Sequence, residues 1–378
     1  MDLSVRFLGT SASRPTVERN VTSLAVRRGG ETFLFDCGEG TQRQMMRYGV
    51  SFNVGEIFFT HMHADHILGV TGLVRTMALQ GRTDPMTLFG PPKSERLLRQ
   101  AVTLGSDKQH FPINYVEMVP GEPLVRDGYS IVAFAVDHGG ASAMGLAIIE
   151  TPRLGRFNPD LARSMGIPEG PLWGQIHKGK EITLPDGRVV HPSELVGPTR
   201  AGRKLVFTGD ARPSETTIDV AAGADILIHE ATFADEEAPL ALETGHSTAR
   251  EAATVADRAG VKRLVLTHIS SRYSRDVQEL ATQAREVFPG AVVARDGMEL
   301  VIPFDDAEAG DAAVEPEAED VVERGADVLV PPVEVGLLRQ KGVQVVLPAL
   351  PVERPRRPAE DGPPVVRGRA VGDRKSVV

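Results

Sequence analysis

Cysteine is almost absent from this chain of 378 residues, in which Cys37 is the only one. A single thiol excludes a framework of disulfides and fits a protein of a reducing compartment. Long apolar runs are absent too. None approaches the ~20 residues that a membrane-spanning helix needs, and the first residues lack the basic and apolar regions of a secretory leader. We therefore expect a cytoplasmic protein without a membrane partner.

Positive charge is also in deficit, since Asp and Glu outnumber Lys and Arg by 51 to 42 and the formal net charge is −9. This balance argues against a protein that coats nucleic acid without specificity, but it leaves room for a local basic surface. Hydrophobic residues make up 41% of the chain, which is enough for a sizeable core. The length allows one large domain or two ordinary ones.

Histidine and aspartate, in contrast, are concentrated in one place. Residues 60–66 read Thr-His-Met-His-Ala-Asp-His and follow a short apolar run. Imidazole and carboxylate together suit zinc or a similar divalent cation. On an extended turn after a strand, His61 and His63 project to the same side and can share one metal, whereas Asp65 and His66 stand where the next helix begins and can hold a second. A histidine-rich surface turn is the alternative, but the spacing favours metal binding.

Three more candidate ligands follow later in the chain. His138, Asp210 and His268 each stand just past an apolar, strand-like run. Strand ends are rigid and face the loops, so a sheet protein can assemble a site there. Singly, each residue is more often structural than functional. Together with the first cluster they make seven ligands, enough for two ions with Asp210 as a bridge.

The order of strand-like and helix-like segments divides the chain into four parts. Strands and helices follow one another up to about residue 150 and again from 204 to 302, which predicts two packed mixed sheets with helices outside. Residues 151–200 interrupt this order, because they are dense in Pro and Gly and hold 7 Lys and Arg against 5 Asp and Glu. We expect a folded domain over residues 1–304 with 151–200 as an inserted arm. Residues 305–378, acidic at first and then proline-rich, are predicted to be a disordered tail.

These motifs resemble known families. The His-x-His-x-Asp-His cluster with its later ligands resembles the metallo-β-lactamase superfamily, whose fold is an αβ/βα sandwich of two mixed sheets with outer helices. Residues 229–232 (His-Glu-Ala-Thr), 246–248 (His-Ser-Thr) and the Gly-Pro-rich stretch 166–180 resemble motifs of the ribonuclease Z family within it. Residues 15–20 resemble that family's Pro-x-Lys-x-Arg-Asn loop, with Val17 in place of the lysine. The resemblance covers about residues 1–304.

The resemblance implies a zinc-dependent endoribonuclease that removes the 3′ trailer from precursor tRNA, leaving a 3′-hydroxyl on the tRNA and a 5′-phosphate on the trailer. It implies a homodimer and two zinc ions per chain, with manganese as the alternative metal. One ion would be held by His61, His63 and His138, the other by Asp65, His66 and His268, and Asp210 would bridge them. Asp65 would also orient or deprotonate the attacking water. His246, which we place in the first turn of a helix and polarised by Glu230, would give a proton to the leaving oxygen.

The arm, an insertion expected beside the site, would bind the precursor tRNA through backbone phosphate contacts remote from the cut. The residues expected to contact it are Arg153, Arg156, Arg163, Gly166, Pro168, Gly170, Pro171, Lys178 and Lys180, together with Arg19 and Asn20 of the loop at residues 15–20. Phosphate contacts of this kind position a nucleic acid without reading its sequence.

Two other functions remain open. The first is a small-molecule metallo-hydrolase of the same fold, such as a glyoxalase II-like or an arylsulfatase-like enzyme. The second is a non-catalytic RNA-binding module with a degenerate metal site. The basic insertion argues against the first, because a small ester does not require it. The complete ligand set, with Glu230 and His246, argues against the second.

Overall fold

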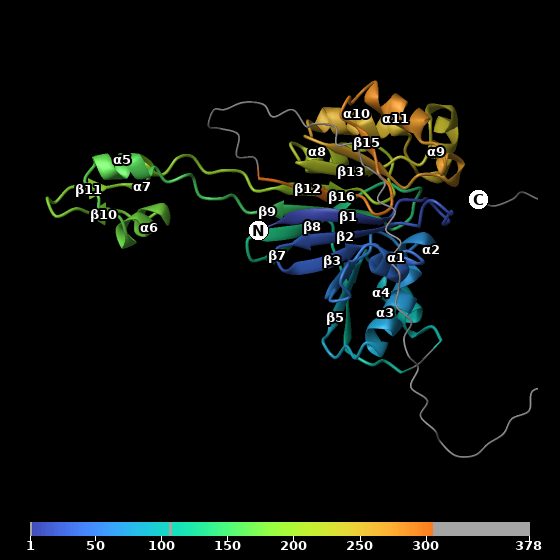
Figure 1. Ribbon diagram of the computed structural model, residues 1–378. Helices are drawn as coiled ribbons and strands as arrows, with labels where there is room; N and C mark the ends of the chain where they lie inside the picture. Colours follow the sequence, from blue (N-terminus) through green and yellow to red (C-terminus); the bar gives the residue numbers. More distant parts are fainter. Residues whose placement is uncertain (1, 106–107, 305–378) are drawn as a thin grey trace, which may run out of the picture. The chain divides into compact units, whose positions relative to one another are not determined.

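The computed structural model describes residues 2–105 and 108–304 (Figure 1). Within them, two seven-stranded sheets pack face to face, and helices cover the outer face of each. This arrangement confirms the predicted αβ/βα sandwich of two mixed sheets. The predicted tail, residues 305–378, lies outside the described residues. No helix in the described part of the chain is long and apolar enough to cross a membrane.

The first sheet is built mainly by the N-terminal half of the chain. Its strand order is β16 (Glu299–Val301), β1 (Leu3–Gly9), β2 (Ser23–Arg28), β3 (Glu31–Phe35), β4 (Glu56–Phe58), β5 (Met86–Gly90) and β6 (Ile113–Glu117). The pairs from β16 to β3 are antiparallel, and those from β3 to β6 are parallel. The helices of this half are α1 (Thr41–Arg47), α2 (Ala64–Ile67), α3 (Gly69–Leu79) and α4 (Glu95–Thr103).

The second sheet holds the later strands. Its order is β15 (Val292–Val293), β14 (Leu264–Thr267), β13 (Ile226–Glu230), β12 (Lys204–Phe207), β9 (Met144–Glu150), β8 (Tyr129–Ala135) and β7 (Pro123–Arg126). The helical segments of this half are α8 (Glu215–Ala221), η1 (Asp235–Glu237), α9 (Ala238–Thr244), α10 (Ala249–Ala259), η2 (Ser271–Tyr273) and α11 (Gln278–Arg285). β7 and α9 are elements that we did not predict.

The alternation of side chains along the strands forms the core. In β13, Ile226 and Ile228 point between the sheets, and Leu227 points to the helices outside. The aromatic rings of Phe35 and Phe207, one from each sheet, stack at 6.1 Å in the middle of the sandwich. Each such ring, fully buried, contributes about 1.5–3 kcal/mol of transfer free energy. Both faces of each sheet are thus buried, so the functional side chains are found at or beyond the strand ends.

Helix α10 shows how local sequence sets an element. Its alanine-rich face packs on the second sheet, and its first turn is closed by a capping box. The Thr248 side chain accepts from the Glu251 N–H and the Glu251 side chain accepts from the Thr248 N–H. Gly260, at φ 59°, ends the helix in the left-handed conformation that glycine adopts at low cost.

The strand directions bring the predicted site residues to one edge. β12, β13 and β14 are parallel, and β8 runs the same way because β9 is antiparallel to both β8 and β12. Their C-terminal ends therefore meet, at the residues that precede His138, Asp210 and His268. In the first sheet, parallel β3 and β4 end just before Asp36 and His61.

The inserted arm starts at the opposite edge of the second sheet. It leaves from the C-terminal end of β9 and returns at the N-terminal end of β12, where Lys204 pairs with Ile149. β9 has seven residues, so its far end lies about 20 Å from the edge that carries the site. The expectation that the arm is attached beside the site is therefore wrong, because an antiparallel connection between β9 and β12 can only start at the other edge.

The arm folds around a small core of its own. The hairpin β10 (Ile182–Thr183) and β11 (Val189–Val190) and the helices α5 (Pro159–Ser164), α6 (Pro171–His177) and α7 (Pro192–Leu195) enclose buried Ala162, Ile167, Ile176, Ile182, Leu184, Val190 and Leu195. Each of the three helices begins at a proline, the residue best suited to the first helical position. The prolines made this segment look irregular in the sequence, but three of them begin its helices.

Buried charges fix the root of the arm. Glu150, 5% exposed at the end of β9, accepts from Arg28 at 2.9 Å and from Arg203 at 2.7 Å. The Arg203 and Arg153 guanidinium groups lie over the ring of Phe304, at 3.8 and 3.5 Å from its centre. The described chain therefore ends packed against the point from which the arm starts.

Candidate metal centre

The seven predicted ligands converge on Asp210. Its carboxylate lies 3.6 Å from Nε2 of His61, 3.3 Å from that of His66, 3.8 Å from that of His138 and 3.2 Å from that of His268. The predicted ligands form two groups whose ligand atoms lie within 4.8 Å of one another, His61, His63, His138 and Asp210 in the first and Asp65, His66 and His268 in the second; a third group joins Asp210 and His268 to His246. The division follows the pairing expected from the sequence.

Local backbone geometry makes this convergence feasible. Gly209 has φ +60°, and a Cβ there would lie 2.7 Å from the side chain of Thr60. Glycine therefore lets the Asp210 loop of the second sheet approach the histidine loop of the first. His63 is the extended residue before α2, so Asp65 and His66 fall in the first turn of that helix, as predicted.

The outer nitrogen of each buried histidine is held by the protein. Nδ1 of His61 lies 3.0 Å from Thr60 Oγ1, and Nδ1 of His66 lies 2.8 Å from Asp36 Oδ2. Nδ1 of His138 lies 2.9 Å from the Gly245 carbonyl, and Nδ1 of His268 lies 2.9 Å from Thr232 Oγ1. Such outer contacts fix the ring orientation of metal-ligating histidines.

The inner atoms fit a metal. Nε2 of His61, His66 and His268 and Oδ1 of Asp210 are buried and lack a hydrogen-bond partner among the described residues. Buried polar atoms are rarely left unpaired, because each costs free energy comparable to a lost hydrogen bond. Four such atoms converging from two sheets match the nitrogen and oxygen donors that zinc accepts. The cluster therefore suits divalent cations.

Asp36 is the central residue that we did not identify from the sequence. It is fully buried at φ 58°, and its carboxylate accepts from the Thr60 N–H at 2.8 Å while facing His66. Burial raises the pKa of Asp36, and the neighbouring His66 only partly opposes this. The available sequence signal was its place at the end of a strand parallel to the one before His61.

Glu230 forms a second buried anchor. Its Oε1 accepts from Nδ1 of His246 at 2.7 Å and from the Ala211 N–H at 3.0 Å. Its Oε2 accepts from the Thr232 hydroxyl at 2.6 Å, and that hydroxyl contacts His268. The carboxylate expected to have a histidine partner therefore has one, and it also supports a ligand histidine through Thr232, a residue given no role from the sequence.

His246 has an environment suited to proton transfer. Burial lowers its pKa, but the Glu230 carboxylate outweighs that effect and raises the pKa to about 9. One ring nitrogen lies within 4.8 Å of ligand atoms of Asp210 and His268. The placement in a first helical turn was wrong, because α10 begins at Ala249 and His246 lies in the loop before its Thr248 cap. A loop position frees the ring to face the cluster.

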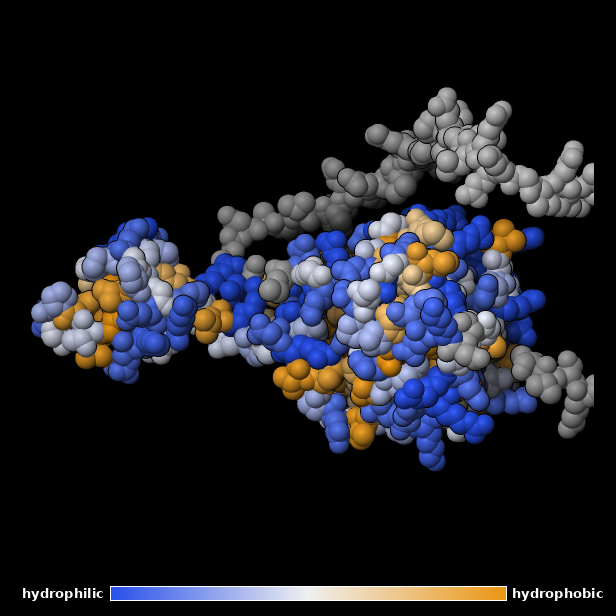
Figure 2. All heavy atoms as spheres, turned by 90° about the horizontal axis from the view of Figure 1, so that it is seen from below, coloured by the Kyte–Doolittle hydropathy of each residue, from blue (hydrophilic) through white to orange (hydrophobic). Residues whose placement is uncertain are grey.

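The predicted substrate-binding residues are not gathered around the metal cluster. On the arm, Arg156, Lys178 and Lys180 are exposed. Arg163 pairs with Asp160 and Glu169. Gly166, Pro168, Gly170 and Pro171 are exposed as well, and Arg153 is half-buried. Figure 2 shows the arm as largely hydrophilic, with hydrophobic patches between.

The loop at residues 15–20 behaves differently. Arg19 is buried, and its guanidinium donates to Thr10 Oγ1 at 2.8 Å and to the Ala294 carbonyl at 2.6 Å. Asn20 donates through its amide to the Glu39 carbonyl at 2.9 Å. Both side chains thus shape the loop from within, while Val17 is 96% exposed at its tip.

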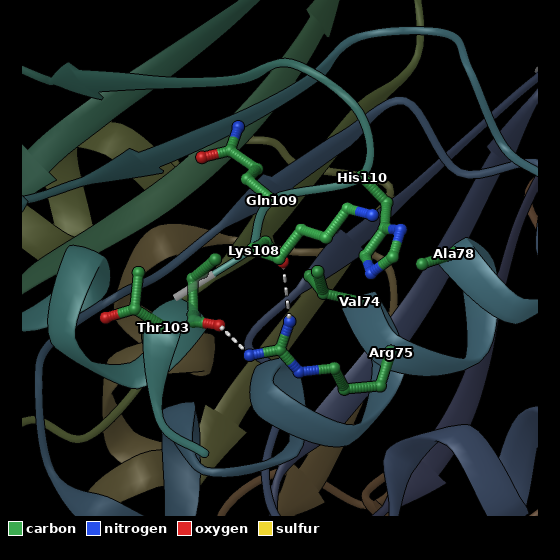
Figure 3. A pocket seen from close by; sticks show the side chains of 8 residues that line it. Val74, Arg75, Ala78, Thr103, Lys108, Gln109 and His110 are labelled. Atoms are coloured by element: carbon green, nitrogen blue, oxygen red, sulfur yellow. Dashed lines mark hydrogen bonds between the residues drawn. The ribbon is translucent and has the colours of Figure 1, made fainter. Parts of the chain in front are cut away.

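A small pocket away from the metal cluster is lined by structural side chains (Figure 3). It lies between α3 and the chain after α4, and Arg75 crosses it to donate to the carbonyls of Val102 and Lys108 at 3.1 and 3.5 Å. Its guanidinium is thus occupied in tying two backbone segments together. No carboxylate of residues 2–105 or 108–304 lines this pocket.

Comparisons with known proteins identify the family of this chain. The family model of the beta-lactamase superfamily domain matches residues 177–269, and that of the anti-Pycsar protein Apyc1 matches residues 3–116. Ribonuclease Z of Gemmatimonas aurantiaca is 60% identical over 301 residues, covering 79% of this chain and 96% of the relative. Ribonuclease Z of Haloferax volcanii is 48% identical over 314 residues, covering 82% of this chain and 99% of the relative.

Among solved structures, the short form of human tRNase Z is similar with a TM-score of 0.57 and 27% identity, covering 80% of this chain and all of that one. The metallo-beta-lactamase fold protein YhfI of Bacillus subtilis, at a TM-score of 0.58 and 18% identity, shares the fold.

Proposed function

Because this chain belongs to the ribonuclease Z family, it is an endonuclease that processes the 3′ end of tRNA, and we propose that two zinc ions in the Asp210 cluster serve this reaction. The observation that carries the metal proposal is the set of unpaired inner atoms of His61, His66, His268 and Asp210. Manganese is the alternative metal, since imidazole and carboxylate donors also accept it.

The residue roles follow the two groups. His61, His63 and His138 would hold one ion, and Asp65, His66 and His268 would hold the other. Asp210 would touch both, because imidazoles of each group lie within 3.8 Å of its carboxylate. Zinc held by these residues would supply a water of lowered pKa and would neutralise charge on the phosphate.

Two side chains of the protein, Asp65 and His246, transfer the protons of the reaction. Asp65, whose Oδ2 accepts from the Ser13 N–H at 2.7 Å, orients the attacking water and takes its proton. His246, fixed by Glu230, donates a proton to the leaving 3′ oxygen as the bond from phosphorus to that oxygen breaks. The tRNA then ends in a 3′-hydroxyl, and the trailer carries the 5′-phosphate that includes the water oxygen.

The arm would supply affinity for the precursor. A tRNA is much larger than the metal cluster, so phosphate contacts remote from the cut are useful. The exposed Arg156, Lys178 and Lys180 support this role in an otherwise acidic protein. An arm rooted at the far edge of the second sheet suits a contact distant from the cleaved bond.

A small-molecule hydrolase and a non-catalytic binding module are less well supported. The ribonucleases Z that match this chain do so over nearly their whole length. Every predicted ligand of the cluster is present. We further propose a cytoplasmic homodimer, the assembly that the family resemblance implies. Sedimentation analysis of the full chain tests this, and a monomer at micromolar concentration would contradict it.

Metal content and activity together test the metal proposal. Atomic emission spectrometry should find two zinc ions per chain in the wild type and fewer in His66→Ala or Asp210→Ala, both of which should lose tRNA cleavage but keep the fold. The control is His191→Ala, an exposed arm histidine paired with Glu181. Normal turnover in either ligand variant would refute the two-metal proposal.

A further inference from the structure

Arg212 occupies a junction between three loops of the site. It stands two residues after Asp210, and its backbone N–H donates to the carbonyl of Asp137, the residue before His138. Its side chain is 17% exposed and reaches the loop that carries His246. None of the roles assigned above involves it.

The guanidinium binds two partners at once. Nη1 and Nη2 meet the two carboxylate oxygens of Glu251 at 2.8 and 2.6 Å, and Nη1 also donates to the His246 carbonyl at 2.6 Å. Such a fork depends on the planar geometry of arginine, which lysine lacks. The pair therefore fixes the backbone of His246 relative to the strand end that carries Asp210.

Glu251 connects this pair to α10. Its Oε2 also accepts from the Thr248 N–H at 2.9 Å in the capping box of that helix. The ring of His246 is held separately, by Glu230. Thus the ring and the backbone of His246 have independent anchors. The ring anchor fixes the orientation of the imidazole, whereas the backbone anchor sets where the ring lies.

We propose that the Arg212–Glu251 pair positions His246 for proton donation to the leaving oxygen. Arg212 is a positioning residue here, because it acts through the His246 backbone. The inference rests on the proposed role of His246 as proton donor. A displacement of about 1 Å of a reacting group can cost a factor of 10² in rate, so loss of the backbone anchor should slow cleavage without preventing substrate binding.

The test uses two substrates that differ in their leaving group. Cleavage of precursor tRNA releases a ribose 3′ oxygen that needs a proton, whereas bis(p-nitrophenyl) phosphate releases a phenolate that leaves without one. In Arg212→Gln and Arg212→Lys, kcat on precursor tRNA should fall about 10- to 100-fold while KM stays within about threefold. Hydrolysis of bis(p-nitrophenyl) phosphate and zinc content should remain at wild-type levels.

Glu251→Gln provides an independent variant, because glutamine can still complete the capping box but lacks the negative charge and the second acceptor oxygen that Arg212 binds. It should give a smaller loss in the same direction. The matched control is Arg258→Gln, which removes an arginine of α10 that pairs with Glu215. That variant should process precursor tRNA like the wild type.

A double variant separates this proposal from the proton-donor role itself. His246→Ala should lower precursor tRNA cleavage and spare the phenolate substrate, and adding Arg212→Gln should lower it no further. If His246→Ala slowed both substrates equally, the proton-donor role would be wrong. If His246→Ala were selective but the Arg212 variants slowed both substrates, lost zinc or had no effect, the positioning role would be overturned while the proton donor stood.

Discussion

Substituting Asp36 by asparagine should weaken metal binding without weakening the fold. The carboxylate lies 2.8 Å from Nδ1 of His66, so it accepts a hydrogen bond from the Nδ1–H and leaves the Nε2 lone pair free to face the cluster. In Asp36→Asn the amide oxygen can still accept from the Thr60 N–H. Its NH₂ group then faces His66 and makes Nδ1 an acceptor. The neutral ring would carry its proton on Nε2, where a metal must bind.

The expected loss follows from the cost of losing such an outer partner. Removing one typically lowers metal affinity 10- to 100-fold, or about 1.4–2.7 kcal/mol. The metal-free protein should lose less than about 1 kcal/mol, because a fully buried carboxylate is itself costly and the amide keeps the Thr60 contact.

Competition with a chromophoric chelator measures the zinc affinity, and urea unfolding of the metal-free protein measures the stability. Asp137→Asn is the control, since Asp137 is exposed and only its backbone carbonyl is used. Wild-type zinc affinity in Asp36→Asn would refute the argument that Asp36 sets the tautomer of His66. A large loss of metal-free stability would show that Asp36 acts mainly in the fold.

Three further predictions concern the rest of the chain. Glu150→Gln should lower the free energy of unfolding at neutral pH by about 3 kcal/mol, because Arg28 and Arg203 lose their buried partner. Burial raises the pKa of Glu150, but Arg203 and Arg28 hold that pKa below its ordinary value. The stabilisation by Glu150 is therefore present above its unfolded-state pKa and is lost as the pH falls through its folded-state pKa. Urea unfolding should show the difference in stability between wild type and Glu150→Gln becoming smaller in acid, and a constant difference would contradict this. Replacing residues 155–196 by a short Gly/Ser linker should raise KM for precursor tRNA at least tenfold but spare bis(p-nitrophenyl) phosphate, since the arm has its own core; equal processing of tRNA would show that the arm does not bind it. A chain ending at Phe304 should keep wild-type kinetics and melting temperature, whereas one ending at Ile302 should melt lower because Phe304 covers Arg153 and Arg203; a loss in the first would move the domain boundary into the tail.

Short-range patterns explain what could be predicted from the sequence. The spacing of His61, His63, Asp65 and His66 is local, and so is the apolar run before each later ligand. The two-sheet sandwich followed from the order of strands and helices. The histidine partner of Glu230 could be anticipated because a buried carboxylate needs a specific contact.

Contacts between distant segments explain what was missed. Asp36, Arg212 and Thr232 act on residues 30, 34 and 36 positions away, so local sequence patterns do not specify these roles. The buried position of the Arg19 side chain depends on its hydrogen bond to the carbonyl of Ala294, which is 275 positions later in the chain. The place of the arm followed from the direction of β9 relative to β12, which the sequence does not specify.

The measurement closest to the central claim is the cleavage of a precursor tRNA with a 3′ trailer by the purified full-length chain. With zinc present, the account predicts one cut at the start of the trailer, a 3′-hydroxyl on the tRNA and a 5′-phosphate on the trailer. Cleavage should stop with a chelator and return when zinc is added. Cleavage that continues in the chelator, or that leaves a 3′-phosphate on the tRNA, would contradict it.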